Sequence, residues 1–386
     1  MSMSTELFDA IFGTTAVTAA VDDAAIVSAM CEAETALARA CARADLIPLP
    51  VALEVGAACQ YVARIDAANI SRRAVSSGNP VVPLVEEIRA RVRERAGEEA
   101  ARAVHLGATS QDILDTALML VAKRALGVVV AEMDECGSHI ADLATTYRTT
   151  PMSGRTLLQQ AVPTTFGALA AVWGEGIDAA ARRLAATRAT LPVQLGGAAG
   201  TLAPLHPRGF AVLAAFADEL DLAEPVGVWH GNRGPVVELA AALGTAAAPI
   251  AKVATDIVLL SQNEVGELAE SNPGGSSSMP HKRNPTAAIT ARAAAAQVPG
   301  LVTTLLAAGS PELQRGAGPW HAEWPALLSA LRYVGGAASR LRTALHLDVD
   351  TTAMARNLGA LDGTLDTADL GHAAELVDRY LEWRKQ

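Results

Sequence analysis

Aromatic residues are scarce in this chain of 386 residues: Phe, Trp and Tyr make up 4%, although hydrophobic residues make up 51%. The apolar content therefore comes mainly from Ala, Leu and Val, and the first two are strong helix formers. Dense β-branched and aromatic runs bounded by turns, which a large sheet requires, are lacking. The composition predicts an all-α fold of long packed helices.

An excess of positive charge is also lacking, since 31 Lys and Arg face 41 Asp and Glu, for a net charge of −10 at pH 7. No basic stripe stands out along the sequence, which argues against nucleic acid as the main partner. Net charge does not exclude an anionic small molecule, because such a ligand responds to the local charge of its site.

Cysteine is limited to Cys31, Cys41, Cys59 and Cys136, and no two of them have CxxC spacing. We therefore expect reduced core thiols, and neither a disulfide framework nor a metal site. The first twelve residues are polar and acidic, unlike a secretory signal. Apolar stretches are interrupted by charges before about 18 residues, so no membrane-spanning helix is expected. Together these features predict a cytoplasmic enzyme.

Four stretches carry helical periodicity over lengths that suggest an elongated bundle. They are residues 111–147, 163–190, 236–270 and 286–308. Shorter helical patterns precede them, at residues 21–45, 51–70 and 85–95. The last long stretch contains one charged residue, Arg292, and a helix that is apolar all round must be buried on most sides. One chain can hardly cover four such helices, so we predict a homo-oligomer around a shared helical core.

The most informative segment is GGSSSMPHKRNP, at residues 274–285. Its Gly and Ser residues would form a mobile loop whose backbone N–H groups are free to bind anions. Lys282 adds a positive charge near a hydroxyl group, and Asn284 and Pro285 begin the next helix, whose N-terminus also favours negative charge. A bare Gly/Ser loop would be a linker, but the whole string favours an anion-binding site.

This segment resembles, at each defining position, the GSSxMPxKxNP signature of the fumarase/aspartase superfamily. Two more segments are similar to the substrate-binding regions of that family, VHLGATSQD at residues 104–112 and GRTLLQQAVPTT at residues 154–165. The resemblance implies an all-α subunit of three domains. We expect them at residues 1–105, 106–335 and 336–386, the last being shorter than is common in the family. The resemblance also implies a homotetramer in which each active site is assembled from three chains.

Roles for individual residues follow from the same resemblance. Ser276 matches the catalytic serine, while Lys282 and Asn284 match the residues that hold the substrate and its developing charge. Six residues match substrate-binding positions: Asn79, Thr109, Ser110, Gln111, Thr156 and Gln159. Thr109 and Ser110 are also candidates to cap the first long helix. No metal or organic cofactor is implied.

The implied reaction removes or adds a proton at the carbon next to a carboxylate, which places a second negative charge on that carboxylate. A site preorganised with cations and N–H donors stabilises this intermediate, and Lys282, Asn284 and the loop amides can supply them. The Ser276 hydroxyl becomes a plausible base when an ammonium group and loop amides stabilise its alkoxide in a closed pocket.

Leu157 departs from the family, in which many members have a histidine that helps to protonate the leaving group. Amine and hydroxide leaving groups benefit from such a general acid, whereas a carboxylate, with a conjugate-acid pKa of about 4, leaves as the anion. The departure favours opening a lactone by β-elimination, or the reverse closure. This is the chemistry of the 3-carboxy-cis,cis-muconate cycloisomerase branch, which acts in the protocatechuate branch of aromatic degradation.

Three further segments resemble that branch. They lie at residues 77–85, 194–201 and 312–324. The polycarboxylate substrate of the branch carries three carboxylates, so it requires cations beyond Lys282. Arg315 is the first candidate to bind it and Arg155 the second, and a structural ion pair is the alternative for each.

Two competing functions remain open. Adenylosuccinate lyase, of the same superfamily, is compatible with residues 281–285, but its amine leaving group would lack an acid at Leu157. A non-catalytic homologue that has kept only the fold is less consistent with the intact Ser276, Lys282 and Asn284.

Five other residues have a simpler interpretation. Trp320, His321, Glu323 and Trp324 lie close together, as expected for a helix with a buried face and an exposed rim. His105 would be a helix-start or pocket-lining residue, with proton transfer as the alternative.

Overall fold

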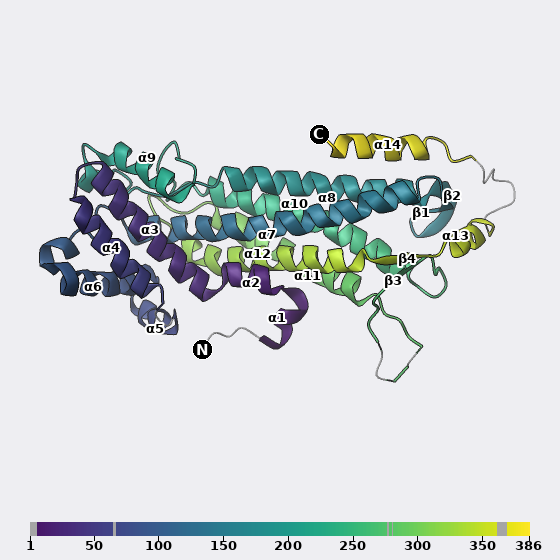
Figure 1. The fold of residues 1–386 in the computed structure, drawn as a ribbon, viewed down its shortest axis with the longest axis horizontal. Helices are drawn as coiled ribbons and strands as arrows, with labels where there is room; N and C mark the ends of the chain where they lie inside the picture. The colour runs from purple at the N-terminus through teal and green to yellow at the C-terminus, as the bar shows by residue number, and fades with distance from the viewer. Residues whose placement is uncertain (1–5, 65–66, 276–277, 280, 361–368) are drawn as a thin grey trace.

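The computed structural model describes residues 6–64, 67–275, 278–279, 281–360 and 369–386, and Figure 1 shows an elongated, mainly helical molecule. Its strands are short and form two separate two-stranded sheets. The predicted all-α class is therefore confirmed.

Five long helices lie side by side along the long axis of the molecule (Figure 1). They are α7 (Ser110–Thr146), α8 (Phe166–Ala189), α10 (Gly234–Leu260), α11 (Thr286–Ala308) and α12 (Pro319–Ala344). α7 packs against α8 and α12, and α11 packs against α10 and α12. The core between them consists mainly of Ala, Leu and Val. The small Ala side chain lets the helix backbones approach closely.

Helices α3 to α6 and α9 cover one end of the bundle, on the left in Figure 1, and α1 and α2 lie along its side against α7, α11 and α12. The bounds of these helices are α1 (Glu6–Phe12), α2 (Thr15–Val21), α3 (Asp23–Arg43), α4 (Leu49–Val62), α5 (Ala67–Ser77), α6 (Val81–Ala101) and α9 (Gly209–Leu220), with a 3₁₀ turn at Ala203–Leu205. α3 packs against α4, α7 and α9, and so joins this end to the bundle.

The opposite end of the bundle carries the strands and the C-terminal helices (Figure 1). These elements are β1 (Pro151–Thr156), β2 (Gln159–Thr165), β3 (Leu268–Glu270), β4 (Leu347–Val349), α13 (Thr351–Leu358) and α14 (Ala373–Arg384). α14 packs against α8, where the Tyr380 hydroxyl donates to Asp178 at 2.9 Å. A Cβ at Gly174 would lie 2.1 Å from that hydroxyl, so this close approach requires glycine.

Several predicted boundaries are wrong. The stretch 163–190 becomes helical at Phe166, because residues 151–165 form the β1–β2 hairpin, and the stretch 236–270 ends at Leu260 before β3. The predicted domain limit at residue 335 falls inside α12. The division into three domains stays a prediction.

The four cysteines are buried and free, as expected of core thiols. By length and composition alone, α10 could cross a membrane. It packs against α8, α11 and α12, as an apolar core helix does.

Candidate active site

The first turn of α7 carries Thr109 and Ser110, two of the predicted substrate-binding residues. Thr109 caps the helix as predicted, and its backbone N–H donates to the Asp112 carboxylate at 2.8 Å. Arg315 donates from Nη2 to the Thr109 hydroxyl at 2.8 Å. The Arg315 guanidinium has no carboxylate within ion-pair distance in the part of the chain described here. The structure therefore brings these three predicted residues together.

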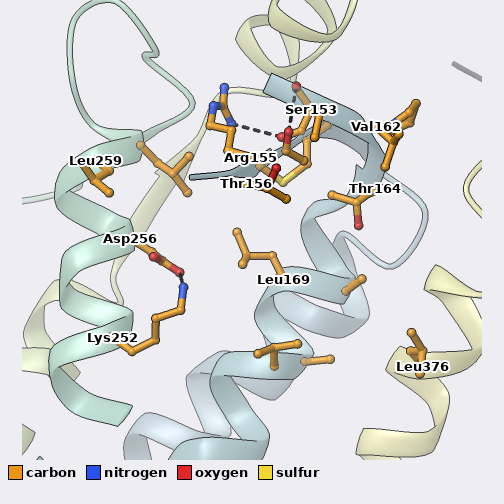
Figure 2. Close-up of a pocket in the computed structure, with 18 of the residues that line it drawn as sticks. Ser153, Arg155, Thr156, Val162, Thr164, Leu169, Lys252, Asp256, Leu259 and Leu376 are labelled. Carbon is orange, nitrogen blue, oxygen red and sulfur yellow. Dashed lines mark hydrogen bonds and ion pairs between the residues drawn. The ribbon is translucent and has the colours of Figure 1, made fainter. Parts of the chain in front are cut away.

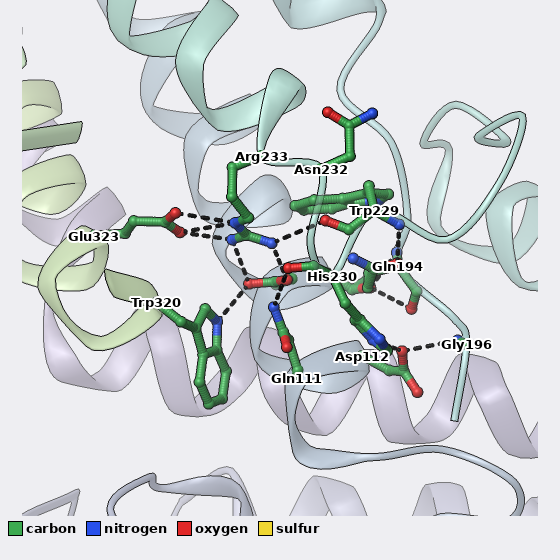
Figure 3. A network of polar contacts seen from close by, with 12 residues as sticks. Gln111, Asp112, Gln194, Gly196, Trp229, His230, Asn232, Arg233, Trp320 and Glu323 are labelled. Carbon is green, nitrogen blue, oxygen red and sulfur yellow. Dashed lines mark hydrogen bonds and ion pairs between the residues drawn. The ribbon is translucent and has the colours of Figure 1, made fainter. Parts of the chain in front are cut away.

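Asp112 fixes this first turn to two other segments (Figure 3). Its buried carboxylate accepts from the backbone N–H groups of Gly196 and Gly197 at 2.8 and 2.9 Å, and it lies 2.6 Å from His230 Nε2. Because a buried carboxylate is costly unless its oxygens are hydrogen-bonded, these contacts hold the turn rigidly.

An ionic cluster lies beside this turn, built from Arg233, Asp115, Glu323 and Trp320 (Figure 3). Arg233 donates to Asp115 at 2.7 and 3.0 Å and to Glu323 at 2.6 Å, and Trp320 Nε1 donates to Asp115 at 2.9 Å. Burial lowers the pKa of Arg233, but the two carboxylates outweigh burial and raise it. Burial also raises the pKa of Glu323, and the contact with Arg233 offsets part of this increase. The cluster joins the N-terminal ends of α7, α10 and α12.

Gln111 points into this interior. It is fully buried, and its amide donates to the His230 carbonyl at 3.2 Å. Its Oε1 atom has no hydrogen-bond partner among the described residues. The geometry therefore makes Gln111 a support of the α7 turn, and direct substrate contact stays a prediction.

Asn79 lies in the turn between α5 and α6. Its amide donates to the Ser77 carbonyl and its side-chain oxygen accepts from Val81 N–H, both at 3.1 Å. Gly78 has φ of +69°, and a Cβ there would lie 3.6 Å from His321 Nε2 on α12. The turn thus lies against the start of α12. Because both ends of the Asn79 amide stabilise its own turn, its contact with substrate stays a prediction.

The predicted residues Thr156 and Gln159 flank the two-residue turn of the β1–β2 hairpin, at the other end of α7. The turn itself is Leu157-Leu158, with φ of +52° and +62°, and the two leucines are 97% and 72% exposed. Arg155 forms a two-pronged ion pair with buried Glu267, at 2.6 and 2.9 Å. The structure therefore supports the second interpretation of Arg155, a structural ion pair, over a contact with substrate.

The described residues of the signature loop lie at the same end of the bundle as the hairpin (Figure 1). Backbone hydrogen bonds of 2.9 and 3.0 Å between Gly274 and Asn284 close its base. Lys282 is exposed near its end, and the Asn284 amide donates to the Gly275 carbonyl at 3.5 Å. Ser276 lies outside the described residues.

The two groups of predicted residues are far apart in one chain. α7 has 37 residues, which at 1.5 Å per residue corresponds to about 55 Å. Thr109, Ser110 and Arg315 lie at its start, and Thr156 and Gln159 follow its end (Figure 1). A small molecule cannot contact both groups within a single chain.

A cavity of about 1050 Å³ lies beneath the hairpin, between α8, α10 and α14 (Figure 2). Leu169, Val162 and Leu376 contribute to its largely apolar wall. Lys252 pairs there with Asp256, which also accepts from Trp173 at 2.7 Å. Apolar walls and paired charges suit a polycarboxylate poorly, because its charges would lose water without gaining partners. Within the described ranges, no group of three or more His, Cys, Asp or Glu residues could hold a metal ion.

Comparisons with known proteins identify the family. A family model described as Lyase matches residues 8–300. A nitrosuccinate lyase from Streptomyces davaonensis is 44% identical over 91% of this chain and 76% of that protein. A 3-carboxy-cis,cis-muconate cycloisomerase from Bradyrhizobium diazoefficiens is 41% identical over 91% of this chain and 78% of that protein.

A solved structure shows the same fold. The 3-carboxy-cis,cis-muconate lactonizing enzyme from Pseudomonas putida superposes with a TM-score of 0.91 at 33% identity, over 99% of each chain. The resemblance inferred from the signature loop is thus confirmed over most of the sequence. The chain is an enzyme that belongs to the lyase family of the fumarase/aspartase superfamily.

Proposed function

We propose that this enzyme interconverts 3-carboxy-cis,cis-muconate and 4-carboxymuconolactone, in the protocatechuate branch of aromatic degradation. One carboxylate of the muconate adds to a double bond of the same molecule, and the carbon next to another carboxylate takes up a proton. The observation that carries the proposal is the similarity to cycloisomerases, in sequence and in solved structure. Leu157, an exposed side chain without acid–base chemistry at the hairpin turn, agrees with it, because a carboxylate leaves without a general acid.

The catalytic roles follow the signature loop. Ser276 delivers the proton to carbon, and removes it in the reverse direction. Lys282 and Asn284 stabilise the negative charge that develops at the carboxylate. Lys282 is exposed, so it is available to an anion from solvent. No metal or organic cofactor takes part in this scheme.

Substrate binding would fall to the two groups of polar residues. Arg315 holds one carboxylate at the start of α7, with Thr109 and Ser110 as hydrogen-bond donors. Thr156 and Gln159 contact the substrate from the hairpin. Gln111 and Asn79 would support the turns that carry these donors, since both amides are engaged locally.

The active enzyme would be a cytoplasmic homotetramer with active sites shared between chains. The separation of the two groups by the length of α7 supports this, because neither group has enough donors and cations alone. The exposed side of α11 also supports it, since Ile289 and Leu306 lie there and Arg292 is the one charge in the helix. The buried free thiols fit a reducing compartment.

A second candidate substrate is nitrosuccinate, favoured by the 44% identity to a nitrosuccinate lyase. Elimination from nitrosuccinate would release nitrite and leave fumarate. Nitrite, like a carboxylate, is the anion of an acid and leaves without prior protonation. Leu157 is therefore compatible with both leaving groups, and a measurement must separate them.

The test follows the ultraviolet absorbance of 3-carboxy-cis,cis-muconate after addition of purified, metal-free enzyme, with a parallel nitrite assay on nitrosuccinate. We expect the conjugated-diene absorbance to disappear while no nitrite forms. A stable diene absorbance together with nitrite release would overturn the proposal and assign the enzyme to nitrosuccinate.

The Leu157→His variant tests the leaving-group argument on the same absorbance signal. Because a carboxylate leaves as the anion, the added histidine should not accelerate lactone opening. A gain of about 100-fold, the size of a general-acid contribution, would contradict the argument.

A further inference from the structure

His321 is an exposed residue in the first turn of α12, and the proposed mechanism gives it no role. Its ring lies 4.7 Å from the Trp324 ring and 5.2 Å from the Trp320 ring, centre to centre. Its Nε2 atom faces the turn at Gly78, where a Cβ would lie 3.6 Å away. The imidazole is therefore held in place on one side by aromatic rings and next to the turn that carries Asn79.

The surrounding structure fixes this position relative to Arg315. Trp320, the preceding residue, donates to Asp115, and Arg315 donates to Thr109. Thr109 and Asp115 lie six residues apart on α7, about 9 Å along the helix axis. Arg315, and Trp320 next to His321, thus both contact the first two turns of α7.

The electrostatics of this location favour an anion. α12 begins at Pro319 and has no acidic residue in its first turn, while Glu323 is buried and paired with Arg233. A 26-residue helix carries partial positive charge at its N-terminus, although Pro319 lacks an N–H group and the N–H groups of His321 and Ala322 donate to the Gly318 carbonyl. The His321 ring therefore lies where the helix dipole favours negative charge.

We propose that His321 binds the third carboxylate of the substrate and so selects tricarboxylates over dicarboxylates. Lys282 and Arg315 account for the other two carboxylates under the proposed function, on which this inference rests. The imidazole N–H donates a hydrogen bond to the carboxylate, and the ring is oriented for it by Trp324. No proton is transferred, so His321 is a specificity-determining residue and takes no part in the chemical step.

Calorimetric titration of the intact oligomer with two non-reacting ligands tests the role. Propane-1,2,3-tricarboxylate carries the extra carboxylate, and glutarate lacks it. His321→Phe keeps an aromatic ring against Trp324 but has no donor, whereas His321→Gln keeps an amide donor and loses the ring. We expect His321→Phe to weaken tricarboxylate binding about tenfold, as for a lost hydrogen bond to a charged group, and to leave glutarate binding unchanged. His321→Gln should recover most of the tricarboxylate affinity.

His372→Phe is the matched control, because His372 is an exposed histidine next to α14, at the opposite end of the bundle. It should bind both ligands like the parent enzyme. The inference is overturned if His321→Phe binds tricarboxylate like the parent, or if His321→Gln is the weaker binder, which indicates ring packing. A different result contradicts the proposed function: the parent enzyme would leave the absorbance of 3-carboxy-cis,cis-muconate unchanged. A selective loss in His321→Phe would then still support a tricarboxylate site.

Discussion

Backbone strain occurs close to several residues that the proposed function uses. Positive φ values are costly for side chains other than glycine, yet His105, Leu157, Leu158 and Leu313 all adopt them. His105 precedes the cap of α7, the two leucines form the hairpin turn, and Leu313 lies two residues before Arg315. Residues that break a local rule mark functional sites when the surrounding fold holds them in place. Asp45, Leu202 and Asp221 also have positive φ and lie outside the predicted substrate-binding segments, so strain by itself does not identify the site.

The strained His105 also carries a pH-dependent contact. Its Nδ1 atom lies 2.5 Å from Oε1 of Glu34, which is fully buried on α3. Burial by itself lowers the pKa of His105, but the Glu34 carboxylate outweighs it and holds the pKa above the ordinary value. Arg89 opposes this shift and Asp112 adds to it.

The His105→Asn variant should therefore change how stability depends on pH. A raised folded-state pKa stabilises the fold below the ordinary histidine value of about 6.5, and this stabilisation is lost as pH rises through the raised value. The parent should lose up to about 1.4 kcal/mol per pH unit in that window relative to the variant. Urea unfolding of both proteins at a series of pH values from 6 to 9 measures the difference. Asn tolerates a positive φ, so the backbone is kept.

His372→Asn is the control for this measurement, because it removes an exposed histidine. It should follow the parent at each pH. Parallel curves for His105→Asn and the parent would show that Glu34 does not hold the proton on His105.

Sequence reasoning at the residue scale found the groups that lie together along the chain. Thr109, Ser110 and Asp112 form a capping pattern within four residues, so the sequence alone predicts the start of α7. The partners of Asp112 were not predictable, because Gly196 and His230 are 84 and 118 residues away. The adjacent glycines at 196 and 197 were a signal of close backbone approach.

At the scale of elements, the buried cluster around Arg233 holds three helices in register. Arg233→Met should leave Asp115 and Glu323 buried without their cation, which destabilises a protein by about 3–5 kcal/mol. The midpoint of urea unfolding, followed by circular dichroism, measures this loss. The Asp115 carboxylate, which accepts from Trp320, would no longer be held by Arg233, so the start of α12 should become less rigid.

A triple variant separates charge burial from packing. Arg233→Met combined with Asp115→Asn and Glu323→Gln removes the unpaired charges and should recover a large part of the lost stability. If Arg233→Met alone costs less than about 1 kcal/mol, ordinary for a surface change, the cluster does not hold the helices.

Helices were easier to predict than strands for a physical reason. The periodicity of residues 111–147 and 286–308 was sufficient, because a long amphipathic or apolar pattern identifies a helix by itself. The β1–β2 hairpin was missed because its turn is Leu157-Leu158, where Asn-Gly would be the usual signal. The β3–β4 pair joins distant residues, such as Ala269 and Asp348, which are 79 positions apart, and no local pattern predicts such a pairing.

At the scale of the whole molecule, one chain separates the groups that the chemistry must combine. Lys282 and the hairpin lie at one end of the bundle, and Arg315 and Thr109 lie at the other (Figure 1). The sequence could predict that the helices form a bundle and that the bundle needs partners. It could not predict which residues share an end, since helix length and direction decide that.

Mixing two inactive variants tests whether chains share a site. Arg315→Ala and Lys282→Ala each remove one cation and should each be nearly inactive alone. When the two variants are unfolded and refolded together, some sites combine an intact Arg315, from a Lys282→Ala chain, with an intact Lys282, from an Arg315→Ala chain. In an equal random mixture each of these two chains is the required variant with a probability of about one half, so about a quarter of the sites have both cations. Turnover of the muconate measures the recovery.

The matched control mixes Arg315→Ala with Thr109→Ala, two changes at the same end of the bundle. Because Arg315 and Thr109 are in contact within one chain, no exchange of chains can restore both, and the mixture should do no better than the average of its components. Recovery in the first mixture but not in the second establishes that a site combines opposite ends of different chains. Equal failure of both mixtures would place the whole site within one chain, and the distance of about 55 Å along α7 would then rule out a joint role for Lys282 and Arg315.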